Sequence, residues 1–154
     1  VSLEGGAGPA IADTELAGAR TTFFNGWVSL TKRFQRGSIT GQVSRTLSPT
    51  YGVGGAALTN LAQVNLRREF YRHWALEVSG AYVHYHLLGE EDATIQNFLF
   101  TSAVFYEPSR WLHLFAAYHY NDQDSNRPDY ASFARNQVFF GVSLVIRNIE
   151  RNRL

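Results

Sequence analysis

The chain has 154 residues, a formal net charge of +1 and no cysteine. The balanced charge gives no support to nucleic-acid binding, and the lack of cysteine excludes disulfides, cysteine-ligated zinc and thiol nucleophiles. No run of about 18 apolar residues occurs, which excludes a transmembrane helix. Aromatic residues make up 14% of the chain and only four residues are proline, a composition that favours β structure in one domain over residues 1–154.

Apolar and polar residues alternate with a period of two, the pattern of strands that have one apolar and one polar face. After Trp74, for example, Leu76 and Val78 alternate with Glu77 and Ser79. The alternation predicts about eight strands of roughly ten residues, the length at which a tilted strand crosses a bilayer. In chain order the predicted strands cover 1–11, 20–34, 38–48, 58–70, 74–87, 95–107, 110–121 and 135–147.

The predicted connections alternate between two kinds. Short ones fall at 35–37, 71–73 and 108–110, and longer ones, rich in glycine, acidic and amide residues, fall at 12–18, 49–55, 89–92 and 122–129. This pattern is typical of bacterial outer-membrane barrels. We therefore expect an all-β fold: an antiparallel up-and-down transmembrane β-barrel, complete in this chain or continued beyond it. Since Val1 lies within a predicted strand, we expect a processed mature protein or a fragment.

The polar face of the predicted strands is rich in uncharged Ser, Thr, Asn and Gln. Solvent-exposed strands usually carry more Lys and Glu, which block pairing at sheet edges. A wet barrel interior fits this face better. The residues predicted to line the lumen are Asn25, Ser29, Thr31, Arg33, Thr40, Gln42, Gln63, Asn65, Arg67, Glu77, Ser79, His113 and His119.

Aromatic residues gather beside the short turns and again toward the longer loops. Tyrosine and tryptophan prefer the headgroup level of a membrane, where the ring is half wet. In a soluble barrel the same rings would instead plug the barrel ends. The predicted girdle consists of Phe34, Phe70, Tyr71, Trp74, Tyr82, Tyr106, Trp111, Tyr118 and Tyr120.

The segment 26–38, GWVSLTKRFQRGS, and the strand end VSRTLSP at 43–49 are the most specific stretches of the chain. They resemble the β-barrel porins associated with exopolysaccharide export and exosortase systems of Gram-negative bacteria. The resemblance covers most of the chain and implies the C-terminal portion of a larger barrel, or a small relative of one. It also implies an outer-membrane location and passage or anchoring of polysaccharide, and it supplies no catalytic residue.

Candidate chemistry is sparse. His84 and His86 share one strand face, and His113 and His119 share another, but the two strands are separated by a third, so we predict no metal site. No catalytic constellation or cofactor motif stands out, and we predict neither an enzyme nor a cofactor. Arg45 has the parity of the apolar Ile39 and Val43; either it reaches the membrane interface or a bulge shifts its register.

The leading functional hypothesis is a porin-like or export-associated barrel that passes hydrophilic solute through a polar lumen. The alternatives are a closed eight-stranded structural or adhesion barrel without a pore, and a soluble ligand-binding barrel. The expected partners are outer-membrane lipid and lipopolysaccharide, with exopolysaccharide or other envelope proteins as further candidates and no nucleic acid. The sequence leaves the oligomeric state open.

Overall fold

The structure, a computed structural model, describes residues 1–14, 19–49, 56–88, 93–127 and 131–144. Within them no helix is long and apolar enough to cross a membrane. All regular elements are strands. They are β1 (Ser2–Thr14), β2 (Ala19–Phe34), β3 (Gly37–Pro49), β4 (Ala56–Phe70), β5 (Trp74–Leu88), β6 (Ala93–Ser109), β7 (Leu112–Ser125) and β8 (Phe133–Leu144).

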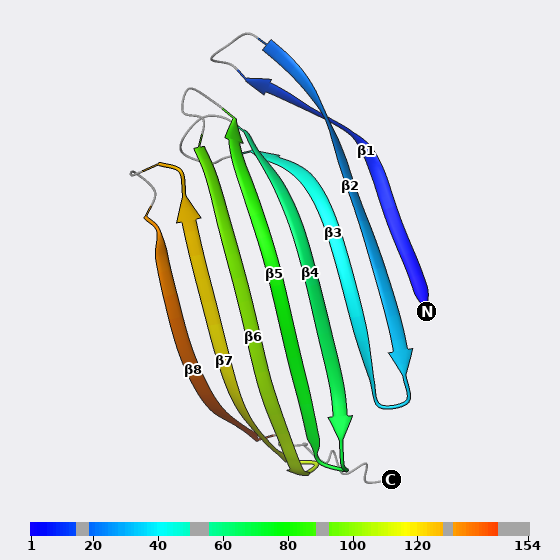
Figure 1. The fold of residues 1–154 in the computed structure, drawn as a ribbon. Helices are drawn as coiled ribbons and strands as arrows, with labels where there is room; N and C mark the ends of the chain where they lie inside the picture. Colours follow the sequence, from blue (N-terminus) through cyan, green and yellow to red (C-terminus); the bar gives the residue numbers. More distant parts are fainter. Residues whose placement is uncertain (15–18, 50–55, 89–92, 128–130, 145–154) are drawn as a thin grey trace, which may run out of the picture.

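The eight strands form one antiparallel sheet in sequence order, β1 to β8, which confirms the predicted up-and-down arrangement. The turns that join β2 to β3, β4 to β5 and β6 to β7 lie at one end of the sheet (Figure 1). This end is called the short-turn end below, and the opposite end the long-loop end. In the described residues β1 and β8 do not pair with each other, so the sheet is open rather than closed into a barrel.

Several strand ends lie two to four residues from their predicted positions; β1, for example, ends at Thr14 instead of residue 11. Strand β6 continues to Ser109, so the turn predicted at 108–110 falls at Arg110 and Trp111 instead. The register shifts between Tyr106 and Ser109, and this irregularity accommodates Pro108 within the strand. At the other end β7 runs to Ser125, which pairs with Ile95, so residues 122–125 belong to a strand rather than to the predicted loop.

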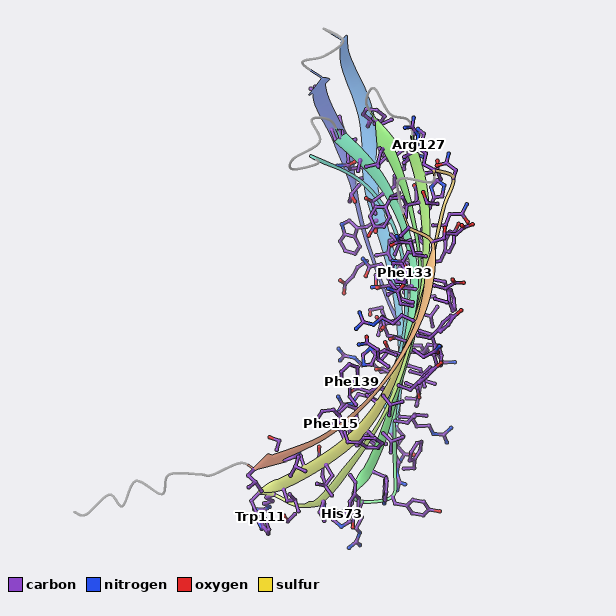
Figure 2. All side chains as sticks on the ribbon, turned by 90° about the vertical axis from the view of Figure 1, so that its left-hand side faces the viewer. His73, Trp111, Phe115, Arg127, Phe133 and Phe139 are labelled. Carbon is purple, nitrogen blue, oxygen red and sulfur yellow. The ribbon has the colours of Figure 1, made fainter. Side chains whose placement is uncertain are left out.

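The sheet bends along its strands, which gives it a concave and a convex face. Figure 2 shows it from the β8 edge, with Phe115 and Phe139 on the concave side. Because directly paired residues project to the same face, the register assigns every strand residue to one face or the other. The concave face contains the polar half of the alternation, and the convex face contains the apolar half.

Little of the described chain is buried. The buried apolar residues are small or aliphatic, namely Ala56, Ala57, Leu58, Val83, Ala93, Ala103 and Ala117. No large side chain among the described residues is fully buried, and convex residues such as Val43 (63% exposed), Val64 (51%) and Phe140 (80%) project from the sheet. An uncovered apolar face of this kind marks a surface for contact with a protein partner or a membrane.

Each edge strand carries a glycine beneath an aromatic ring of its neighbour. A Cβ built on Gly6 of β1 would lie 2.9 Å from Nε1 of Trp27, and one built on Gly141 of β8 would overlap the ring of Phe115. Both pairs lie on the concave face, directly opposite each other in the register. The ring replaces the packing that the glycine lacks and holds the edge strand in register.

Strands β2 and β3 separate toward the long-loop end. Their pairing extends from Phe34 and Gly37 to Gly26 and Arg45, whereas β1 and β2 continue as a two-stranded ribbon (Figure 1). Where the β2–β3 ladder stops, Leu47 donates its backbone N–H to Oδ1 of Asn25 at 2.8 Å. This side chain satisfies a backbone donor that the missing ladder would leave unpaired.

Candidate functional site

The register brings all thirteen residues predicted to line a lumen to the concave face. Strands β2 to β5 contribute eleven of them, and β7 contributes His113 and His119. They lie on one face because side chains alternate along each strand, and because the register of each hairpin places polar residues opposite polar residues.

A continuous polar row crosses the concave face from β2 to β8. Its members, each paired with the next, are Thr31, Thr40, Asn65, Ser79, Thr101, His119 and Gln137. Hydrogen bonds join neighbours along it: the Thr31 and Thr40 hydroxyls lie 3.0 Å apart, and Oγ1 of Thr101 lies 3.3 Å from Nδ1 of His119. The row therefore presents hydroxyl, amide and imidazole groups and no formal carboxylate or guanidinium charge.

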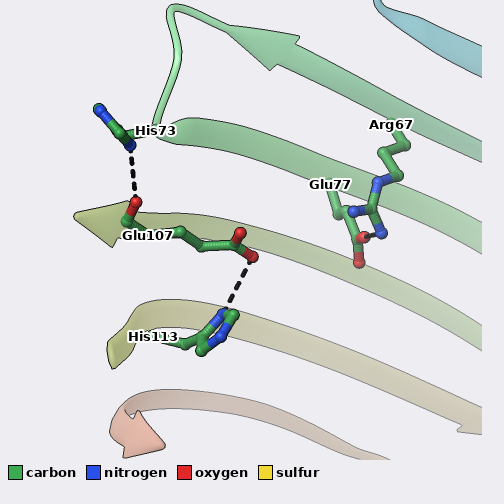
Figure 3. Close-up of polar contacts among 5 residues, drawn as sticks. All are labelled: Arg67, His73, Glu77, Glu107 and His113. Carbon is green, nitrogen blue, oxygen red and sulfur yellow. Dashed lines mark hydrogen bonds and ion pairs between the residues drawn. The ribbon is translucent and has the colours of Figure 1, made fainter. Parts of the chain in front are cut away.

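The two adjacent rows add an amide pair and an ion pair. In the row toward the long-loop end, Nε2 of Gln63 donates to Oε1 of Gln42 at 3.0 Å. In the row toward the short-turn end, Nη1 of Arg67 donates to Oε1 of Glu77 at 2.6 Å (Figure 3). Both charged side chains are about half exposed, so their contribution to stability is small, but they neutralise each other on this face.

A hollow of ≈ 270 Å³ lies in the concave face around the Arg67–Glu77 pair. Residues Ser38, Asn65, Ser79 and Thr101 of four neighbouring strands line it together with the pair. Its lining mixes hydrogen-bond donors, acceptors and aliphatic side chains. Such a surface can hydrogen-bond water or a hydrophilic solute, and the side chains present no nucleophile paired with a base.

A second polar cluster lies at the short-turn end of β5, β6 and β7. Glu107 donates its backbone N–H to the carbonyl of His73 at 2.8 Å, and Nδ1 of His73 lies 2.8 Å from the Glu107 carbonyl. The Glu107 carboxylate lies 3.1 Å from Nδ1 of His113 (Figure 3). Glu107 therefore joins the turn before β5 and strand β7 to β6 at the point where the β6 register shifts.

The histidines do not form one site. His84 and His86 of β5 lie on the convex face, whereas His113 and His119 lie on the concave face. No group of three or more His, Cys, Asp or Glu residues suited to a metal ion occurs in the described part of the chain. The predicted loop 89–92 lies outside the described residues.

The predicted girdle residues fall on the convex face or in the turns. Phe70, Trp74 and Tyr106 form a row at the short-turn end, where the Trp74 and Tyr106 rings stack at 4.4 Å. Tyr71 and Trp111 lie in the turns and are 84% and 58% exposed. Phe34 ends β2, next to its turn, while Tyr82, Tyr118 and Tyr120 lie near the middle of β5 and β7 rather than at the strand ends.

The concave face is also more aromatic than the predicted lumen residues suggest. Trp27, Phe115 and Phe139 project from it and are 41%, 38% and 43% exposed. His119 meets Phe139 edge-on at 5.1 Å, which places an aromatic patch beside the polar row. Strand parity in the sequence is enough to assign such a ring to the concave face, because Trp27 lies two residues from both Asn25 and Ser29, which are on that face.

Comparison with known proteins yielded no match of the chain to a family model, to a curated protein or to a solved structure.

Proposed function

We propose that this chain forms part of the wall of an outer-membrane β-barrel, and that its concave face lines a passage for hydrophilic solute. The observation that carries the proposal is the direction of the bend. A soluble barrel turns its apolar face inward, whereas a membrane barrel turns its apolar face outward. Here the apolar face is the convex one.

The dimensions of the apolar face support the proposal. On β4 ten residues separate Phe70 from Asn60, and the same spacing separates Trp74 from His84 on β5. At 3.3–3.4 Å per residue this is roughly 33 Å along the strand. With a tilt of about 40° it corresponds to a height of roughly 25 Å, the height of the apolar band of membrane barrels. Arg68, just inside the short-turn boundary, is long enough to reach the interface.

The open sheet favours the wall of a wide barrel over a closed eight-stranded one. Eight strands leave an interior that side chains just fill, whereas about sixteen leave a water channel. The concave side chains here are half exposed around an open hollow, and β1 and β8 do not pair with each other in the described residues. The resemblance to export-associated porins is consistent with a wide barrel and makes polysaccharide a candidate solute.

Conductance of the purified protein in a planar lipid bilayer tests this proposal. We expect stepwise current increases on insertion, because a polar concave face in a wide barrel encloses water. Bilayers to which detergent alone is added are the control. Failure to conduct, despite incorporation into vesicles shown by flotation, would contradict the passage. A protein that stays monodisperse in water without detergent would contradict the membrane location itself.

A further inference from the structure

A row of polar side chains interrupts the apolar convex face toward the long-loop end. Arg45, Asn60, His84 and Gln96 pair with one another in the register across β3 to β6. The pairings show no shift around Arg45, so the strands keep it on the convex face, and the bulge considered from the sequence is absent there. The row therefore places a cation at the boundary of the apolar band.

Among the residues that the structure describes, none supplies a side-chain partner for this cation. Arg45 is exposed, and the side chains of Arg45 and His84 make no hydrogen bond or ion pair with any described residue. The carboxylate in the same row, Asp124, stands four strands from Arg45, roughly 19 Å at the usual strand spacing. It accepts a hydrogen bond from the hydroxyl of Ser132 at 3.0 Å. The potential around Arg45 thus favours an external anion.

Directly beside this row the convex face is hollowed. A depression of ≈ 460 Å³ is lined mainly by convex residues of β2 to β6, among them Val28, Val43, Val64, Tyr82 and Phe98. Its floor is open because Gly41 and Gly80 have no side chain, and a Cβ built on either would meet nothing within 4 Å. Gly41 lies four residues from Arg45 on β3, about 13 Å along the strand.

We propose that this depression and the polar row form a binding site for one anionic, phosphate-bearing membrane lipid. Its acyl chain fills the depression over Gly41 and Gly80, and its phosphate meets Arg45, with Asn60 and His84 as further donors. The apolar floor of the depression and the unpaired guanidinium of Arg45 together suit a ligand with an apolar chain and an anionic head. A neutral lipid would fill the depression but leave Arg45 without a partner. The site rests on the proposed membrane location but not on the passage.

The test measures lipid binding to the full chain in detergent micelles by native mass spectrometry. The probes are phosphatidic acid and the diacylglycerol with the same acyl chains, and inorganic phosphate is added as a competitor. We expect one phosphatidic acid per chain, bound about tenfold more tightly than diacylglycerol, since hydrogen bonds to a charged group are the stronger ones. Excess inorganic phosphate should not displace it, because it lacks the acyl chain.

Two variants test the two halves of the site. Arg45→Gln should weaken phosphatidic acid about tenfold, to the level of diacylglycerol, and Gly41→Leu should weaken both lipids by filling the depression. Lys32→Gln removes a cation from the same face near the short-turn end and should change nothing. Gly8→Leu adds the same side chain to an open glycine on the concave face and should also have no effect.

Equal loss of phosphatidic acid binding in Arg45→Gln and Lys32→Gln would overturn the proposal, because any cation on the convex face would then bind the phosphate equally well. Equal affinity for phosphatidic acid and diacylglycerol would overturn it as well, and displacement by inorganic phosphate would reduce the site to a simple anion site. These outcomes leave the membrane location intact. That location fails separately, if the chain needs no detergent.

Discussion

An arginine substituted at either of two adjacent positions of β4 should destabilise the protein in a bilayer to very different degrees. Val64 lies on the convex face, six residues from Phe70 and four from Asn60, and thus near the middle of the apolar band. Gln63 is its neighbour on the concave face. Arginine at the midplane of the lipid-facing surface costs about 2–4 kcal/mol. Val64→Arg should therefore lower the folding equilibrium constant roughly 30- to 700-fold.

Gln63→Arg provides the matched control. It removes the hydrogen bond to Gln42 at a cost of about 1 kcal/mol or less and places the new charge in water. Urea unfolding in lipid vesicles, followed by tryptophan fluorescence, measures both free energies of unfolding. If the two variants are equally destabilised, or Gln63→Arg is the worse, the faces are not divided between lipid and water as argued.

Three further predictions follow from the structure. Gly141→Ala forces the Phe115 ring aside and should destabilise the chain by about 1–3 kcal/mol in the same unfolding assay, and Phe115→Ala combined with it should cost less than the sum of the two single changes. Tyr71 has a φ of 58°, so Tyr71→Gly should raise the free energy of unfolding in detergent by about 1 kcal/mol; a lower value would mean that the ring stabilises the turn. Glu77→Gln leaves Arg67 unpaired on the concave face and should shift the reversal potential of the reconstituted channel toward anions, whereas Arg67→Gln should shift it toward cations; shifts of the same sign would contradict the assignment of this face to the passage.

The alternation in the sequence was sufficient to predict all eight strands and the face of most residues. The reason is physical: the side-chain period of a strand is two, and a short turn such as that between Phe34 and Gly37 leaves the next strand little freedom of register. Arg45 follows the same parity: its alternation predicts a charged residue among apolar ones, and the register places it on the convex face.

Features that depend on neighbouring strands were not predictable from alternation. The end of β6 is one example, because the contacts of Glu107 with His73 and His113 extend the pairing past Pro108. Another is the inclusion of residues 122–125 in β7, where acidic residues continue the ladder with β6. The direction of the bend is a third, because it arises from the whole sheet rather than from any one strand.

The rings over Gly6 and Gly141 affect the register of the two edge strands, β1 and β8. A slip of one residue at β8 would move the Phe115 ring from Gly141 onto Phe140 or Val142, and a slip of β1 that brings Ala7 opposite Trp27 would set this ring against a methyl group. The register of β8 is therefore fixed by its inner neighbour β7, and β2 opposes one direction of slip in β1. Any strand that joins at β1 or β8 therefore meets an edge whose polar and apolar faces are already set.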